Sequence, residues 1–209
     1  MLGNKEHNHV MRIVFQGDSI TDCNRDRSVP ASLGEGYVKM TCENLPPEWE
    51  TINRGISGNR VYDLEARWDQ DCLDHKPDLV TILIGINDTW RRYDSNIASP
   101  VAEFEGSLNR ISKRVVDSGA KLILLEPFVL PIPADRIAWR EDLDPRIQAV
   151  RRVATSYADA FVPFDGIFAA SSCRLPMAEL AHDGVHPSEL GHRLMAAHLL
   201  AAIQTVFQP

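Results

Sequence analysis

The sequence predicts a three-layer α/β/α domain built around a five-stranded parallel sheet. Short apolar runs alternate with segments of helical periodicity along the 209-residue chain, which is the pattern of consecutive β-α-β units. The run DLVTILIG, at residues 78–85, is apolar at nearly every position, as expected for a strand that helices cover on both faces. The length suits one such domain, so we expect a single domain over residues 1–209.

Five segments have the composition of buried strands. They cover residues 12–16, 49–53, 78–85, 121–128 and 160–165. Parallel strands joined by right-handed helical crossovers form an open sheet. With five strands, the expected arrangement is the flavodoxin-like order 2-1-3-4-5.

Helical patterns fill the intervals between the strands. They cover residues 34–45, 62–75, 100–118, 144–159 and 188–206. Pro187 suits the first position of the last helix, and Gly119 stands where a C-cap glycine follows the third. The stretch 127–143 contains three prolines and no clear period, so it is predicted to be an irregular substrate loop.

Charge and hydropathy argue against several classes of partner. The net charge is −7 and no basic run stands out, so nucleic acid is not an expected partner. No stretch approaches the roughly 20 apolar residues of a membrane span. The N-terminus lacks the apolar run of a secretory signal, which favours a cytoplasmic location, and residues 1–10 are predicted to form a loose extension.

The cysteines do not form a recognisable framework. None belongs to a C-x-x-C pair and their spacing is irregular, so free and mostly buried thiols are expected at Cys23, Cys42, Cys72 and Cys173. Cys23 follows Ser19 by four positions, and a helix there would place both on one face.

Polar and glycine residues follow the expected strands at their carboxyl ends. The segments are GDSIT at 17–21, RGISGN at 54–59 and GINDTW at 85–90, with HDGVHP at 182–187 before the final helix. Ligands of open parallel sheets bind at this edge. Four distant segments are therefore expected to meet in one site.

These segments contain the groups that nucleophilic catalysis by serine requires. Ser19 needs a base to take its proton, and the base needs a third group to orient it. His186 and Asp183 are three positions apart in a tight turn and can supply both. The following helix N-terminus would disfavour a positive charge on His186, so we expect a lowered pKa there.

Acyl transfer also needs donors for the developing oxyanion. The Ser19 and Gly58 backbone N–H groups and the Asn87 side-chain amide are candidates. Taken singly, Ser19 reads as a helix N-cap, Gly58 as a turn glycine and Asn87 as a loop cap. Their joint position at one sheet edge favours a catalytic set, with Asp18 expected to brace the turn.

These four segments resemble the sequence blocks of the SGNH, or GDSL, hydrolases, which are serine esterases with a flavodoxin-like fold. The resemblance implies that Ser19 is the nucleophile, His186 the base and Asp183 its orienting acid. It implies that Gly58 and Asn87 complete the oxyanion hole, and that the enzyme needs neither a metal nor a cofactor. The G-x-S-x-G elbow of α/β-hydrolases is absent.

Residues 55–94 more closely resemble the intracellular serine acetylxylan esterases of bacteria. The matching residues are Ala66–Trp68 and the pattern IND-W-R-YD through Asp94. This resemblance implies an acetylated carbohydrate substrate and a homo-oligomer. Trp90, Tyr93 and Trp139 are the candidate substrate-binding residues, since aromatic faces can stack on a sugar or wall an acyl pocket. Packing or a subunit interface is the alternative role.

Other readings of the site remain open. A lysophospholipase or thioesterase could use the same catalytic set. A phosphate- or flavin-binding module could use Ser19 and Thr21 in the first βα turn, but this reading leaves Asp183 and His186 unexplained. A metal site near His182 and His192 lacks the H-E-x-x-H pattern.

Overall fold

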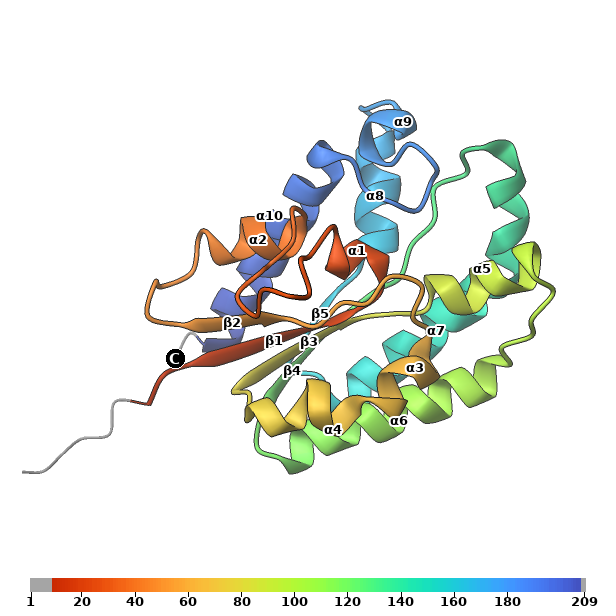
Figure 1. Cartoon of the computed structure of the whole chain (residues 1–209). Coiled ribbons are helices and arrows are strands. Elements are labelled where there is room, and N and C mark those ends of the chain that lie inside the picture. The colour runs from red at the N-terminus through yellow and green to blue at the C-terminus, as the bar shows by residue number, and fades with distance from the viewer. Residues whose placement is uncertain (1–8, 208–209) are drawn as a thin grey trace, which may run out of the picture.

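The computed structural model describes residues 9–207, whose five strands form one parallel sheet in the order β2-β1-β3-β4-β5 (Figure 1). The strands are β1 (Arg12–Gly17), β2 (Glu50–Asn53), β3 (Leu79–Leu83), β4 (Lys121–Leu125) and β5 (Ala160–Val162). The predicted fold class and strand order are confirmed. Strands β3, β4 and β5 end two to three residues before the predicted segments do, whereas β1 ends one residue later, at Gly17.

Each face of the sheet has its own apolar core. Ile13 and Phe15 of β1 pack on one face, and Val14 packs on the other. Every residue of β3 is buried, since helices cover both faces of this central strand. The continuous apolar run that predicts β3 therefore reflects its two-sided burial.

One face of the sheet is covered by the first and last helices of the chain. Here α2 (Tyr37–Cys42) packs along the C-terminal α10 (Glu189–Phe207), as Figure 1 shows above the sheet. The same side carries the short α1 (Ser19–Asp22), α8 (Phe164–Ser172) and α9 (Met177–Leu180). This layer holds the end of α10 that faces the site.

The other face is covered by the helices from the middle of the chain. The long α6 (Val101–Asp117) and α7 (Arg140–Tyr157) pack against each other, and α3 (Val61–Ala66) packs on α6. Two short elements, α4 (Trp68–Asp71) and the 3₁₀ turn η1 (Leu73–His75), complete the connection to β3. Helix α5 (Ile86–Asp94) lies beyond the carboxyl end of β3.

Several sequence predictions need correction. The expected helix 62–75 is broken at Arg67, whose φ of −110° and ψ of 13° interrupt the regular geometry. The stretch 127–143 is irregular only to Pro133. The 3₁₀ helix η2 (Ala134–Trp139) follows and α7 begins at Arg140, because Trp139 and Leu143 turn inward and are buried.

Two further predictions concern the last helix and the cysteines. Pro187 lies two residues before α10 and pairs with Ala181 in a β-bridge instead of starting the helix. All four cysteines are free, as predicted, but only Cys72 is buried and Cys173 is exposed. Of the expected extension 1–10, residues 1–8 lie outside the described residues, and His9 Nε2 lies 2.5 Å from Asp78 Oδ1. Within 9–207, no helix has both the length and the apolar character to span a membrane.

Candidate active site

Ser19 begins helix α1 immediately beyond the end of β1. A side chain at Gly17 would bring its Cβ within 2.6 Å of the Leu83 carbonyl oxygen, so the exit from β1 requires glycine. Asp18 is the N-cap, and its Oδ1 accepts a hydrogen bond from the Ile20 N–H at 3.0 Å. The N-cap is therefore Asp18 and not Ser19, which corrects the interpretation of Ser19 as a cap, and Asp18 braces the turn as expected. The Ser19 hydroxyl therefore stays available for other contacts.

A chain of hydrogen bonds joins Ser19, His186 and Asp183. The Ser19 Oγ lies 2.9 Å from His186 Nε2, and His186 Nδ1 lies 2.7 Å from Asp183 Oδ2. An ionised carboxylate only accepts, so Nδ1 carries the proton and Nε2 accepts from the serine hydroxyl. This is the geometry in which an imidazole can take the serine proton.

The turn that carries Asp183 and His186 is held from within. Asp183 Oδ1 accepts from the backbone N–H groups of Val185 at 3.0 Å and of His186 at 2.8 Å. Gly184 has a φ of +80°, and a Cβ there would lie 2.3 Å from the Ile132 carbonyl oxygen. Glycine is thus required both by the backbone and by the close approach of the 127–133 segment.

That segment also contacts the turn from outside. The Leu130 N–H donates to the Gly184 carbonyl at 2.8 Å. Arg136 Nε donates to the Asp183 carbonyl at 3.3 Å. The stretch predicted as a substrate loop therefore supports the Asp183–His186 turn, and no motif in the sequence marks Arg136 for this contact.

The pKa values of both ionisable groups of the turn are shifted, in opposite directions. Burial favours the neutral carboxyl, but hydrogen bonds from the His186 ring and from two backbone N–H groups hold the pKa of Asp183 well below its usual range. The hydrogen bond to Asp183 raises the pKa of His186 despite its burial. The expectation of a lowered pKa is wrong, because Asp183 is in direct contact while α10 begins three residues further on.

The candidate oxyanion donors belong to two turns that are tied to the end of β1. Gly58 has a φ of +84° in the turn after β2. The Ile56 N–H of that turn donates to the Gly17 carbonyl at 3.1 Å, and Asn87 Nδ2 donates to the Asn59 carbonyl at 3.1 Å. The three predicted donor segments are thus connected at one edge of the sheet.

A pair of buried carboxyls lies beneath this edge. Asp18 and Asp88 are both 0% exposed. Asp88 accepts from the Val61 N–H and the Ser99 hydroxyl, whereas Asp18 Oδ2 has no partner within the described residues. Burial raises the pKa of Asp18 to about 7 and that of Asp88 to about 6. Asp88 follows Asn87 directly in the sequence, but the sequence motif does not indicate that Asp88 is buried.

The predicted aromatic residues form one cluster beside His186. The ring of Trp90 lies 5.8 Å from the His186 ring and 5.2 Å from Trp139, and Tyr93 stacks on Trp139 at 5.5 Å. Trp139 is only 2% exposed, and Arg136 lies 4.1 Å above its ring. In this arrangement Trp139 supports Trp90 and Tyr93 and does not present a free face.

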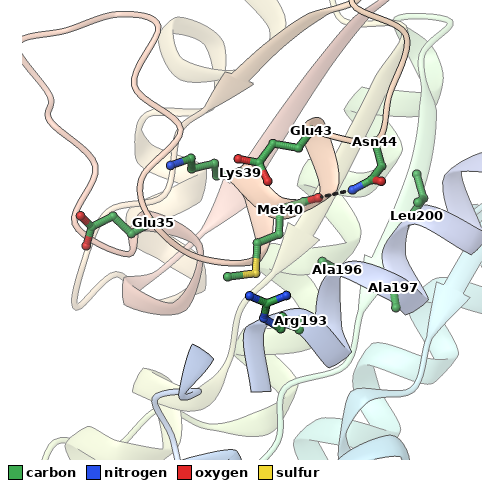
Figure 2. A pocket seen from close by; sticks show the side chains of 9 residues that line it. All are labelled: Glu35, Lys39, Met40, Glu43, Asn44, Arg193, Ala196, Ala197 and Leu200. Atoms are coloured by element: carbon green, nitrogen blue, oxygen red, sulfur yellow. Dashed lines mark hydrogen bonds between the residues drawn. The ribbon is translucent and has the colours of Figure 1, made fainter. Parts of the chain in front are cut away.

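An open cleft of about 400 Å³ lies on Ser19 and His186. Its other walls include Cys23, Ser57 and His192. A second cavity of about 450 Å³ lies between α2 and α10, where Met40 faces Ala196 (Figure 2). Neither Ser19 nor His186 lines this second cavity, so it is not the candidate active site.

Cys23 lies on the cleft without sharing a helix with Ser19. Helix α1 ends at Asp22, and Cys23 turns into the left-handed region with a φ of 36°. Among residues 9–207, no three His, Cys, Asp or Glu side chains are grouped so that they could hold a metal ion.

Comparison with known proteins relates this arrangement to a family. The profile of the GDSL-like Lipase/Acylhydrolase family matches residues 15–194. The acetylxylan esterase of Geobacillus stearothermophilus is 36% identical over 205 residues, which are 92% of this chain and 93% of that protein. The crystal structure of Axe2, an acetylxylan esterase from the same organism, superposes with a TM-score of 0.83 at 33% identity, covering 95% of each chain. A Parabacteroides merdae protein described as a GDSL-like lipase gives a TM-score of 0.89 at 35% identity, over 93% of this chain and 96% of its own.

The Geobacillus stearothermophilus esterase has also been solved as three catalytic mutants. In these a serine, an aspartate or a histidine is replaced by alanine, and the aspartate and histidine are three positions apart. Asp183 and His186 have the same separation. From the profile match and the identity over nearly the whole length, this chain belongs to the GDSL-like Lipase/Acylhydrolase family and is a carboxylic ester hydrolase.

Proposed function

We propose that the protein removes acetyl groups from carbohydrates through an acetyl-enzyme, with Ser19 as nucleophile. The observation that carries the proposal is the Ser19–His186–Asp183 hydrogen-bond chain at the mouth of an open cleft. His186 Nε2 takes the hydroxyl proton as Ser19 Oγ forms a bond to the acetyl carbonyl carbon. Asp183 stabilises the imidazolium that results.

In the following steps His186 passes the proton to the leaving sugar and then acts as a base for water. The tetrahedral intermediate collapses, the carbon–oxygen bond to the sugar breaks, and the sugar oxygen leaves with the proton from His186. Water then attacks the acetyl-enzyme as His186 accepts its proton. His186 returns that proton to Ser19 Oγ as the bond to the acetyl carbon breaks, and acetic acid leaves and ionises to acetate. The raised pKa of His186 suits a group that must hold a proton between these two steps.

The negative charge on the carbonyl oxygen needs donors that are oriented in advance. We assign this role to the backbone N–H groups of Ser19 and Gly58 and to the Asn87 side chain. Asn87 is 4% exposed and already bonded to the Asn59 carbonyl. A side chain held in this way loses little entropy when it binds the oxyanion.

The substrate class rests on the relatives and on the chemistry of the cleft. Acetylxylan esterase is the name of the Geobacillus stearothermophilus relative and of a second relative from Xylanibacter ruminicola, 24% identical over 93% of this chain. Asn24, Ser57 and His192 are among the residues of the cleft. These polar side chains suit an acetylated sugar better than they suit the long acyl chain of a lysophospholipid. Among acetylated sugars, we propose xylo-oligosaccharides first.

The aromatic cluster is assigned to the acyl side of the site. Trp90 is the member nearest His186, and it can close the space around an acetyl methyl group. Tyr93 and Trp139 hold its ring in place through their mutual stacking. The predicted homo-oligomer and cytoplasmic location stay predictions.

A substrate panel tests the proposal. It contains acetylated xylo-oligosaccharides, other acetylated sugars, 4-nitrophenyl acetate and decanoate, and a lysophospholipid, with the Ser19→Ala variant as control. We expect acetate release from the sugars and much faster cleavage of the acetate ester than of the decanoate. Equal rates on decanoate, or activity on lysophospholipid alone, would replace the acetylesterase with the lysophospholipase alternative.

A further inference from the structure

Two dissimilar surfaces flank Ser19. The loops after β2 and α1 and the start of α10 supply the walls of the open cleft, through Ser57, Cys23 and His192. The aromatic cluster comes from α5 and η2, which follow β3 and β4. Because β1 lies between β2 and β3, the cleft and the cluster lie on opposite sides of the serine.

On the aromatic side, the ring of Trp139 is already covered by its neighbours. Arg136 lies 5.3 Å from the ring centre of Trp90 and 4.1 Å from that of Trp139, and Tyr93 stacks on the latter. Guanidinium and aromatic faces in contact leave no free ring face of Trp139 for a sugar. The cleft is open, and about 400 Å³ lies within the range of about 300–1,000 Å³ typical of small-molecule sites.

One wall of the cleft is a neutral pair, Cys23 and His192. The Tyr37 N–H donates to His192 Nδ1 at 3.1 Å, so Nε2 carries the proton of the neutral ring. Nε2 in turn lies 3.4 Å from Cys23 Sγ. Burial lowers the pKa of His192 to about 4 and raises that of Cys23. The thiol therefore stays protonated, and the pair is not a second nucleophile and base.

The backbone fixes this wall rigidly. Cys23 is held in the left-handed region while its N–H donates to the Ser19 carbonyl and its carbonyl accepts from the Glu35 N–H at 2.7 Å. A Cβ at Gly36 would lie 2.8 Å from both Cys23 Cβ and His192 Cε1. Gly36 therefore has to be a glycine for the two side chains to meet, and the cleft exists before any ligand binds.

We propose that this cleft binds the alcohol half of the ester, a sugar, and that Cys23 sets the size of the leaving group. The inference rests on the proposed function, since it places the two halves of an acetylated sugar on opposite sides of Ser19. An acetyl methyl would leave most of the cleft empty, whereas a sugar ring can meet the polar groups of Asn24 and Ser57. His186 lines the same cleft, so it can protonate the departing oxygen.

The test compares two selectivity ratios in Cys23→Met, a change that extends an unbranched side chain into the cleft. The leaving-group ratio is kcat/KM for benzyl acetate, or for acetylated xylobiose, divided by kcat/KM for methyl acetate. The acyl ratio is kcat/KM for methyl butyrate divided by that for methyl acetate. We expect the leaving-group ratio to fall by about tenfold or more, because overpacking excludes the larger alcohol, while the acyl ratio is kept.

The matched control is Cys173→Met, the same exchange at an exposed cysteine after α8. It should leave both ratios unchanged. Ser57→Gln fills the cleft from an exposed turn and should repeat the effect if Cys23→Met does not fold. A fall in the acyl ratio alone, or no change in either ratio, overturns the assignment. If the wild type cleaves benzyl acetate but no acetylated sugar, the proposed carbohydrate function is wrong. The leaving-group ratio measured with benzyl acetate then still tests whether the cleft binds the alcohol half of the ester.

Discussion

Ser19 Oγ and His186 Nε2 lie 2.9 Å apart although 167 positions separate them in the sequence. The contact forms because β1 delivers Ser19 to the rim of the sheet and the turn before α10 returns His186 to the same place. Both ends of the contact are braced, by the Asp18 cap on one side and by Asp183 on the other. The proposed proton transfer from Ser19 to His186 depends on this one hydrogen bond.

Asp183→Asn should lower kcat by about 10³–10⁴-fold, as expected when the orienting carboxylate of such a triad is lost. The remaining activity should also change its pH dependence. His186 must be neutral to act as a base, so activity falls as the pH drops through its pKa. Asp183 raises that pKa from 6.5, so the acid limb of the wild type lies above pH 6.5 and that of the variant lies lower.

The measurement is kcat/KM for 4-nitrophenyl acetate against pH. Asp117→Asn, which removes a carboxylate that pairs with Lys113 on the surface of α6, is the control and should keep the wild-type profile. An acid limb that stays in place in Asp183→Asn would mean that another group controls the titration.

Asn87→Ala should lower kcat by about 10²–10³-fold with little change in KM, because an oxyanion donor acts mainly in the transition state. Steady-state kinetics on an acetate ester measures kcat and KM separately. Asn109→Ala, which removes an amide that donates to the Glu105 carbonyl on α6, should be neutral. A kcat within threefold of wild type would remove Asn87 from the oxyanion hole.

Gly184→Ala should destabilise the protein by about 1–3 kcal/mol, because its φ of +80° and the contact with the Ile132 carbonyl are both unfavourable for alanine. Activity should fall as well, since the same turn carries Asp183 and His186. Urea unfolding gives the free energy. Gly166→Ala is the control: it lies in α8 with no atom within 4 Å of the added Cβ, and helix propensity favours alanine there. Equal stability of both variants would contradict the close approach.

Asp18→Asn should make stability less dependent on pH. Burial raises the pKa of Asp18 from 3.8 to about 7, so the folded protein binds a proton that the unfolded chain releases. The contribution of protonated Asp18 to the free energy of unfolding is fully present below pH 3.8 and is lost as the pH rises to about 7. Asparagine keeps an N-cap oxygen and removes the titration.

The free energy of unfolding at pH 5 and pH 8 measures this effect. The wild type should lose more stability between the two values than Asp18→Asn does. The same loss in both proteins would show that Asp18 ionises normally in its buried position.

The strands and the polar residues at their carboxyl ends could be predicted because short stretches of sequence indicate them. A run such as residues 79–83 has to be apolar when both faces are covered, and the polar residues that follow each strand mark its carboxyl end. The sequence does not predict helices α5 and α8, since INDTWRRYD is largely polar and FDGIFAASS contains a glycine and two serines. Their packing, and not their propensity, makes them helical.

In the candidate site too, residues in short motifs could be predicted, whereas contacts that depend on tertiary packing could not. Ser19, Asp183, His186, Gly58 and Asn87 stand in short motifs at strand ends, and the structure brings their segments together. The contact of Cys23 with His192 spans 169 positions and follows no motif, so only the packing of α10 against the first turn reveals it. The sequence indicates an aromatic side chain at Trp139 but not its burial. That burial depends on the 3₁₀ helix η2, which the prolines and the weak periodicity of this stretch do not predict.

The central claim is that Ser19 is the nucleophile, and hydrolysis of 4-nitrophenyl acetate by Ser19→Ala tests it most directly. The exchange removes one hydroxyl and leaves the Asp18 cap and the backbone donors in place. We expect a variant with the wild-type unfolding transition and a kcat/KM lower by several orders of magnitude, on the order of 10⁴-fold or more. A folded Ser19→Ala protein that keeps hydrolysis within tenfold of wild type would contradict the account.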